Sequence, residues 1–346
     1  MDIVRVAGTL IQSEYLDLGL GYDLNELIKK NKYDTSIFNP LYFKQLANNA
    51  GATKGEVYGL PINLISPYVL YYNKDLFNRF GIPFPKNGMT WDETYEIANK
   101  LNRVEGGVNY QGFSAVYTEY LRDNQLAVPA LDPGANKMND TEKWKPLFDN
   151  LLRFYPTVGN PIGANSAADQ SKFIKERTAS MLLAQLNTSV RSFPADLNWD
   201  MVSLLVFKEK PNAGSIPPPA YFSITQQSKH KEAAFEVIQY LLSKEVQLEH
   251  SKEGRGTSLI DPEVQQAFGQ NSEVLKTKNI SAIFYHKNTE AMPARKEGLI
   301  PIEAGVTQKI ISDAFIDVAT GKSDINTVLS TAQEKIGKEI ENVKNK

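Results

Sequence analysis

The residue types that most often carry catalysis or metal binding are sparse in this chain. Its three histidines, His230, His250 and His286, show no metal-ligand spacing, and it has no cysteine. These counts do not favour a histidine or thiolate metal site. Neither glycine-rich phosphate motif occurs, the glycines at 254–257 are too closely spaced for one, and Gly-x-Ser-x-Gly is missing. We therefore expect no cofactor and no metal.

A pair of carboxylates is the one enzymatic option that remains. A glycosidase needs two acids roughly 5 to 10 Å apart, and some pair among 40 acidic residues will meet that distance by chance. A carbohydrate-active enzyme is therefore the alternative, not the leading hypothesis. Sixteen tyrosines and three tryptophans suit stacking on sugar rings and hydrogen bonding to hydroxyls. Most of them should still be core residues, and Trp91, in the first turn of a capped helix, is expected to be structural.

Bulk properties narrow the class of protein. A length of 346 residues exceeds what one hydrophobic core supports, so two domains are expected. The formal charge of −2 argues against nucleic-acid binding. No apolar run approaches the roughly 18 residues of a membrane helix, and the N-terminus has no export-signal pattern.

Strands and helices alternate along the sequence. Strands are predicted near residues 2–6, 113–117, 181–183, 201–207 and 222–224. Helices are predicted at 24–30, 40–50, 91–101, 144–155, 228–242, 306–320 and 325–336, with capping boxes at Asp23 and Thr90. Pro146 is expected in a first helical turn, and the helix after Ser228 should bury Ala234, Val237, Ile238, Leu241 and Leu242. The alternation predicts an α/β architecture with helices on both sheet faces.

Five segments, in order, carry a family resemblance. They are residues 2–4, 56–63 with 71–82 and 90–93, 173–183, 228–235, and 319–321 with 325–336. Together they resemble the bacterial extracellular solute-binding proteins of family 1, the sugar-binding, maltose-binding-protein-like group of ABC transporters. One departure is Glu176-Arg177, which stands where the family usually has a glycine.

The resemblance implies an α/β, two-lobed, periplasmic-binding-protein-like fold of type II. The first lobe would comprise 1–66 plus 222–260, and the second lobe 67–221 plus 261–346, with the ligand between them. The implied function is non-enzymatic: the substrate-binding component of an ABC importer, which delivers a carbohydrate or similar polyhydroxylated solute to permease subunits. A ligand sensor with the same fold stays open.

The resemblance also implies a set of ligand-binding positions. Asn63, Ser66 and Tyr68 fall on the first crossing between lobes, and Tyr117 follows a strand that commonly offers an aromatic platform. The remaining positions follow other strands or lie on the return crossing: Gly8, Thr9, Gln185, Asn187, Ala220 and Tyr221. The amides at 185 and 187 replace an aromatic that is frequent in the family. They favour a ligand recognised by more hydrogen bonds and less stacking than a maltodextrin.

The family resemblance includes an upstream region. Members begin with an export signal, a lipid-modified cysteine and a strand-helix-strand before the segment that matches residues 2–4. We therefore expect the first lobe to be N-terminally truncated, with the edge of a buried parallel sheet left unpaired. In the full-length form the resemblance implies an extracellular, membrane-anchored, monomeric lipoprotein, although this sequence itself carries no export signal.

Overall fold

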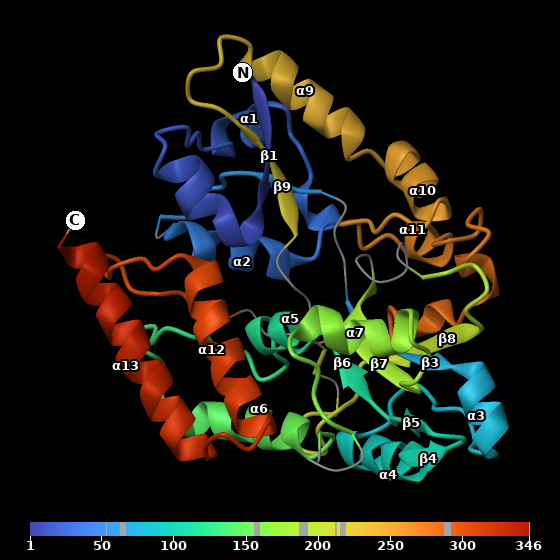
Figure 1. The fold of residues 1–346 in the computed structure, drawn as a ribbon. Helices are drawn as coiled ribbons and strands as arrows, with labels where there is room; N and C mark the ends of the chain where they lie inside the picture. Colours follow the sequence, from blue (N-terminus) through green and yellow to red (C-terminus); the bar gives the residue numbers. More distant parts are fainter. Residues whose placement is uncertain are drawn as a thin grey trace. The chain divides into compact units, whose positions relative to one another are not determined.

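The computed structural model describes residues 1–52, 54–62, 67–155, 160–186, 193–211, 213–214, 219–286 and 292–345 (Figure 1). The chain forms two compact units. Unit 1 comprises Met1–Ser66, Pro217–Thr277 and Ala291–Gly298, and unit 2 comprises Pro67–Ile216, Lys278–Glu290 and Leu299–Lys346.

These boundaries differ from the expected ones at the return to the first unit. β9 (Ala220–Ile224) begins in unit 1, because all five of its residues pair with β1 (Ile3–Ala7). The segment after residue 260 also stays with unit 1. Val264, on α11 (Pro262–Gln266), packs in one hydrophobic core with Phe38 and Leu259.

Unit 1 is built on a three-stranded sheet in the order β1-β9-β2, with β2 at Leu60–Pro61. β9 is antiparallel to both neighbours, so the parallel sheet expected from the sequence is wrong for these strands. The helices of this unit are α1 (Asn25–Lys30), α2 (Pro40–Ala50), α9 (Lys231–Leu241), α10 (Lys244–Lys252) and α11.

Alternate residues of β1 and β9 face two separate cores. Ile3 and Ile224 pack with α1 and α9, and Val6 and Tyr221 pack with Tyr15 and with α2. The buried stripe of α9 differs from the expected one. Ala234, Phe235, Ile238 and Leu242 are buried, whereas Val237 is 48% exposed. Phe235 lies one turn before Ile238 and is buried on the same face of α9, so position 237 lies on the outward face.

Unit 2 contains a four-stranded sheet in the order β6-β7-β3-β8. The strands are β3 (Tyr68–Asn73), β6 (Ser114–Ala115), β7 (Met181–Gln185) and β8 (Trp199–Ser203). β3 is antiparallel to β7 and β8, and β6 is parallel to β7. All residues of β3 are buried, which explains why its sequence reads as a continuous apolar run and not as an alternation.

The helices of unit 2 are α3 (Lys74–Phe80), α4 (Trp91–Leu101), α5 (Tyr117–Arg122), α6 (Thr141–Leu152), α7 (Ser166–Ile174), α12 (Ala304–Ala319) and α13 (Ile325–Lys344). α7 contacts β6 and β7, and the others share one large core. A hairpin of β4 (Arg103–Glu105) and β5 (Val108–Tyr110) completes the unit. In Figure 1, α12 and α13 run side by side, and their buried faces include Phe315 and Ile336.

Of the predictions made from helix caps and prolines, one is confirmed and two are wrong. The capping box at Thr90 is present, with both reciprocal hydrogen bonds to Glu93. The one expected at Asp23 is wrong, because this carboxylate accepts from the amides of Asn25 and Val57 and so joins α1 to a distant segment. Pro146 lies inside α6 and not in its first turn, since the helix begins earlier, at Thr141.

Candidate functional site

Seven of the ten expected ligand-binding residues are described, and they fall in both units. Asn63, Ser66 and Asn187 lie outside the described residues. Tyr68, Tyr117 and Gln185 belong to unit 2. The other four belong to unit 1: Gly8, Thr9, Ala220 and Tyr221.

Tyr68 and Gln185 lie opposite each other at the ends of β3 and β7. The Gln185 amide donates to the Tyr68 hydroxyl at 3.1 Å and to Asp123 Oδ2 at 3.1 Å. The Tyr68 hydroxyl donates to the same carboxylate oxygen at 3.2 Å. Asp123, directly after α5, therefore receives two neutral donors from the sheet, and all three residues are buried.

Arg122 is the member of this group that reaches solvent. Its guanidinium binds Asp123 through two hydrogen bonds, 2.9 Å from Nε to Oδ1 and 2.5 Å from a terminal nitrogen to Oδ2. Its side chain is 31% exposed, against 5% for Asp123. Burial lowers the pKa of Arg122, but the hydrogen bond and charge of Asp123 outweigh it and raise that pKa overall. The guanidinium is therefore held as a fixed cation.

Glu119 adds a second carboxylate on the same helix, one turn before Asp123. Burial raises its pKa, Arg122 opposes that shift and Asp123 reinforces it. Its Oε2 is buried and has no hydrogen-bond partner among the described residues, which leaves an acceptor unused. We call Tyr68, Glu119, Arg122, Asp123 and Gln185 the α5 cluster. It combines buried residues that fix geometry with two side chains, those of Arg122 and Glu119, that are only partly buried.

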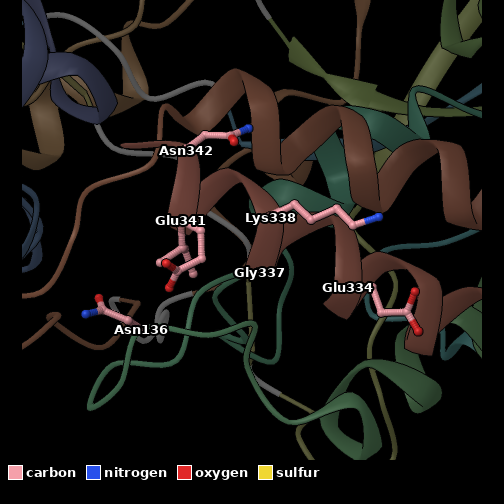
Figure 2. Close-up of a pocket in the computed structure, with 7 residues that line it drawn as sticks. Asn136, Glu334, Gly337, Lys338, Glu341 and Asn342 are labelled. Carbon is pink, nitrogen blue, oxygen red and sulfur yellow. The ribbon is translucent and has the colours of Figure 1, made fainter. Parts of the chain in front are cut away.

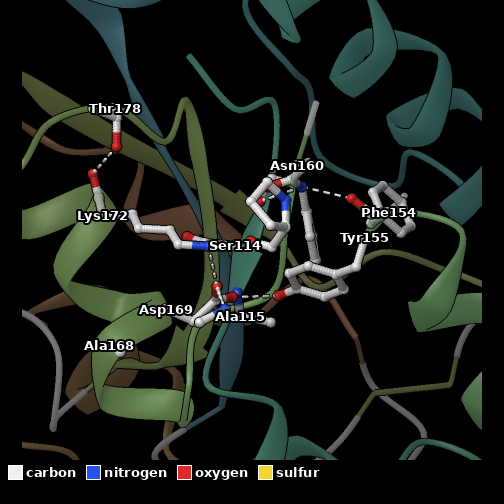
Figure 3. A network of polar contacts seen from close by, with 12 residues as sticks. Ser114, Ala115, Phe154, Tyr155, Asn160, Ala168, Asp169, Lys172 and Thr178 are labelled. Carbon is white, nitrogen blue, oxygen red and sulfur yellow. Dashed lines mark hydrogen bonds and ion pairs between the residues drawn. The ribbon is translucent and has the colours of Figure 1, made fainter. Parts of the chain in front are cut away.

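A buried network fixes the chain where it enters α5 (Figure 3). The Asp169 carboxylate accepts from the backbone amides of Ala115 at 2.9 Å and Gly163 at 3.0 Å. Tyr155 and Lys172 also donate to it, at 2.5 and 2.8 Å, and Figure 3 shows both side chains directed at this carboxylate. Because Ala115 ends β6 and Tyr117 begins α5, Asp169 holds the strand end that positions the α5 cluster.

In unit 1, the expected positions gather at one end of the sheet. The Gly8 amide donates to the Pro219 carbonyl at 3.0 Å, and its carbonyl accepts from the Asn49 side chain at 2.9 Å. Ala220 pairs with Ala7 in the neighbouring strand. Gly8, Thr9 and Ala220 are therefore neighbours, of which Thr9 is exposed. The Tyr221 hydroxyl points elsewhere and donates to the Tyr42 carbonyl at 2.6 Å.

Tyr117 is placed differently from Tyr68 and Gln185. It is the first residue of α5, it is fully buried, and its ring lies 5.2 Å from that of Phe315. Trp91 is likewise a core residue, as expected, and its indole donates to Gln125 at 3.1 Å.

A separate hollow lies along α13 and is far from these residues in the sequence. Figure 2 shows the side chains around Gly337, where the absence of a side chain opens the helix surface. It is lined by Asn136, Glu334, Gly337, Lys338, Ile340, Glu341 and Asn342. None of the seven expected ligand-binding residues that are described lines it.

The sequence reasoning missed Glu119, Arg122 and Asp123. A signal was present, because acids at 119 and 123 are one helical turn apart and flank an arginine. It was hidden by the prediction that the strand from 113 continues to Tyr117, whereas β6 ends at Ala115 and α5 begins shortly after it.

No helix in the part of the chain described above is both long enough and apolar enough to cross a membrane.

Comparison with known proteins places the chain in a family. Residues 6–248 match the family model described as bacterial extracellular solute-binding protein. A curated binding protein of Brucella abortus is 26% identical over 215 residues, which cover 55% of this chain and 48% of that protein. The sn-glycerol-3-phosphate-binding periplasmic protein UgpB of the same organism is 33% identical over 73 residues, 21% of this chain and 16% of that protein. The chain thus spans at most about half the length of these curated relatives.

Solved structures agree at the level of fold. The sugar-binding protein MalE of Xanthomonas citri superposes with a TM-score of 0.71 at 16% identity, covering 99% of this chain and 84% of that one. At such low identity the likeness concerns the two-lobed periplasmic-binding fold alone. The family match covers well over half of the sequence, and the chain belongs to the bacterial extracellular solute-binding protein family.

Proposed function

We propose that this chain captures a carbohydrate or a similar polyhydroxylated solute and delivers it to the permease of an ABC importer. The observation that carries the proposal is the family match over residues 6–248. The α5 cluster supports it, because Arg122 is a donor and Glu119 an acceptor, both partly buried and held on a rigid base. Hydroxyl groups, which both donate and accept, are the ligand chemistry that such a mixed set suits.

The charges of the α5 cluster favour a neutral ligand over a phosphate ester. Asp123 occupies the Arg122 guanidinium through two hydrogen bonds, and Glu119 adds a further carboxylate. A phosphate that approached Arg122 would have to compete with a paired carboxylate and would be repelled by another. We therefore place sn-glycerol 3-phosphate, the ligand in the printed name of one relative, behind neutral sugars and polyols.

Calorimetry and thermal-shift measurements test the proposal. The panel would include compounds seen with structural neighbours, namely maltotriose, mannotriose, ribitol and glycerophosphocholine, together with sn-glycerol 3-phosphate. We expect at least one neutral compound to bind stoichiometrically. Arg122→Ala should then weaken binding about tenfold or more, since a hydrogen bond from a charged donor contributes about 1.5 to 3 kcal/mol.

Arg79→Ala is the matched control, because Arg79 lies in the same unit and pairs with the exposed Glu105. It should leave affinity unchanged. Binding of phosphate esters alone, or equal losses in both variants, would contradict the assignment of a neutral ligand to the α5 cluster.

We also propose that the chain is not an enzyme. The competing hypothesis is a carbohydrate-active enzyme that uses the Glu119 and Asp123 carboxylates. The ion pair of Asp123 with Arg122 and its buried donors hold it away from a free nucleophilic role. Prolonged incubation with oligosaccharides separates the two, since product formation lost in Glu119→Gln would establish the enzyme.

The remaining proposals concern partners and location. We infer an extracellular or periplasmic, lipid-anchored, monomeric protein that docks on permease subunits. Permease genes beside this gene would support transport, whereas a neighbouring receptor gene would favour the sensor. Co-purification with those permease subunits in the presence of ligand is the direct test of the partnership.

A further inference from the structure

The sequence contains one Asn-Gly dipeptide, Asn87-Gly88, in the loop between α3 and α4 of unit 2. The Asn87 carboxamide ties this loop to two other segments. Its Oδ1 accepts from the Ser203 amide at 2.9 Å and from the Asn279 side chain at 3.1 Å. Its Nδ2 donates to the Ser281 hydroxyl at 3.0 Å. Asn87 therefore joins the end of β8 to residues 279–281.

Glycine is required at the next position. Gly88 has φ of +78°, and a Cβ added there would lie 2.1 Å from the Tyr285 hydroxyl oxygen. A side chain would thus meet backbone strain and would force the half-exposed Tyr285 side chain to move. The fold needs the amide at 87 and the absence of a side chain at 88, so it retains a dipeptide that is chemically labile.

We propose that Asn87 is a latent deamidation site which the folded structure protects. In this reaction the Gly88 backbone nitrogen attacks Asn87 Cγ, a C–N bond forms, and the Cγ–Nδ2 bond breaks. Nδ2 leaves as ammonia and takes the proton lost by Gly88. Water then opens the resulting succinimide at either carbonyl and leaves aspartate or isoaspartate at position 87. The sum consumes one water and releases one ammonia, with no change in oxidation state.

Protection comes from the hydrogen bond made by the attacking nitrogen. The Gly88 N–H donates to Ser203 Oγ at 2.8 Å, and attack requires that proton to leave. The contacts of Asn87 also fix the carboxamide, so Cγ cannot turn toward Gly88 without breaking them. Two donors on Oδ1 polarise the carbonyl and would favour attack, but only after the nitrogen is released. The Ser203 hydroxyl is therefore the group that decides the rate.

Conversion would alter this part of unit 2. Isoaspartate routes the backbone through one additional methylene, which displaces the acceptor now bonded to the Ser203 amide. The same acceptor holds Asn279, whose side chain also donates to the Met201 carbonyl at 3.1 Å. The attachment of residues 279–281 to β8 would loosen, and the product would mark molecules in which this region had opened.

Peptide mass spectrometry after incubation at mildly alkaline pH measures the reaction. We expect Asn87 in the folded wild-type protein to convert about a hundredfold more slowly than in the urea-unfolded chain. That ratio corresponds to about 2.7 kcal/mol, within what releasing several hydrogen bonds costs. Exposed Asn271, followed by Ser272, is an internal reference that should convert at similar rates in both states.

Ser203→Ala is the decisive variant. It removes the acceptor of the Gly88 N–H but keeps the backbone amide that polarises Asn87, so conversion should accelerate about tenfold, whereas the loss of one hydrogen bond should lower the melting temperature by only a few degrees. Ser180→Ala is the matched control, because that buried hydroxyl has no hydrogen-bond partner among the described residues. Equal rates in folded and unfolded wild type, or equal rates in Ser203→Ala and Ser180→Ala, would overturn the proposal.

Discussion

Replacing Asp123 by asparagine tests whether the α5 cluster is a fixed, charge-assisted assembly. The substitution keeps the shape of the side chain but removes the charge that binds Arg122 and accepts from Tyr68 and Gln185. Hydrogen bonds to a charged group are worth about 1.5 to 3 kcal/mol each. Breaking a fully buried ion pair costs about 3 to 5 kcal/mol.

Two features reduce that cost. The Arg122 side chain is 31% exposed, so water replaces part of what it loses, and the asparagine carbonyl still accepts one hydrogen bond. We therefore expect unit 2 to lose about 2 to 3 kcal/mol of stability. Glu105→Gln is the comparison, because the Arg79–Glu105 pair is 46% exposed on both sides and should contribute less than about 1 kcal/mol.

Urea unfolding followed by tryptophan fluorescence reports this change selectively, because all three tryptophans, Trp91, Trp144 and Trp199, lie in unit 2. Asp123→Asn should lower the transition midpoint at an unchanged slope. A midpoint shift no larger than that of Glu105→Gln would refute the reasoning, because it would show that the buried carboxylate is not a structural anchor.

Other substitutions probe single statements about the fold. Arg177 has φ of +57°, so the free energy of unfolding in urea should be about 1 kcal/mol larger for Arg177→Gly than for Arg177→Ala. In regular structure the alanine variant is usually the more stable one, and that result would rule out a left-handed residue. Burial raises the pKa of Glu119 above its usual value of 4.5, so wild-type stability should fall as pH rises above that value, and Glu119→Gln should be the more stable form at neutral pH but not in acid. A constant difference in melting temperature across pH would contradict this. Val237→Lys should change stability by less than about 0.5 kcal/mol, whereas Ile238→Ala should cost about 2 to 5 kcal/mol, both measured by circular dichroism. Similar losses in the two variants would show that Val237 is buried, as first expected for α9.

Local periodicity and caps predicted most elements well. The helix that starts at Pro40 and ends at Gly51, and the one capped by Thr90, were visible because each signal involves residues within one turn. Strand direction was not visible in this way. β9 lies between β1 and β2 only because segments far apart in the sequence pair with one another, and nothing in the sequence of either strand specifies antiparallel pairing.

The α5 cluster shows the same division between local and distant information. Tyr68 and Gln185 were proposed through the family resemblance, and the register of β3 and β7 places them opposite each other. Asp123 and Arg122 escaped notice because their importance depends on an acceptor shared with two distant strands. A small change in where β6 ends also decides whether Tyr117 points outward or, as found, into the core beside Phe315.

The place of β9 at the centre of its sheet has a consequence for how the protein is made. β1 and β2 emerge from the ribosome early, since β2 ends at Pro61, but the strand that joins them ends at Ile224. By then the four strands of the other sheet, the last of which ends at Ser203, have been synthesised. Unit 2 can therefore begin to assemble its sheet first, whereas β1 and β2 cannot pair with β9 until the ribosome has passed Ala220. This interval is when a nascent chain is most open to aggregation and to chaperones.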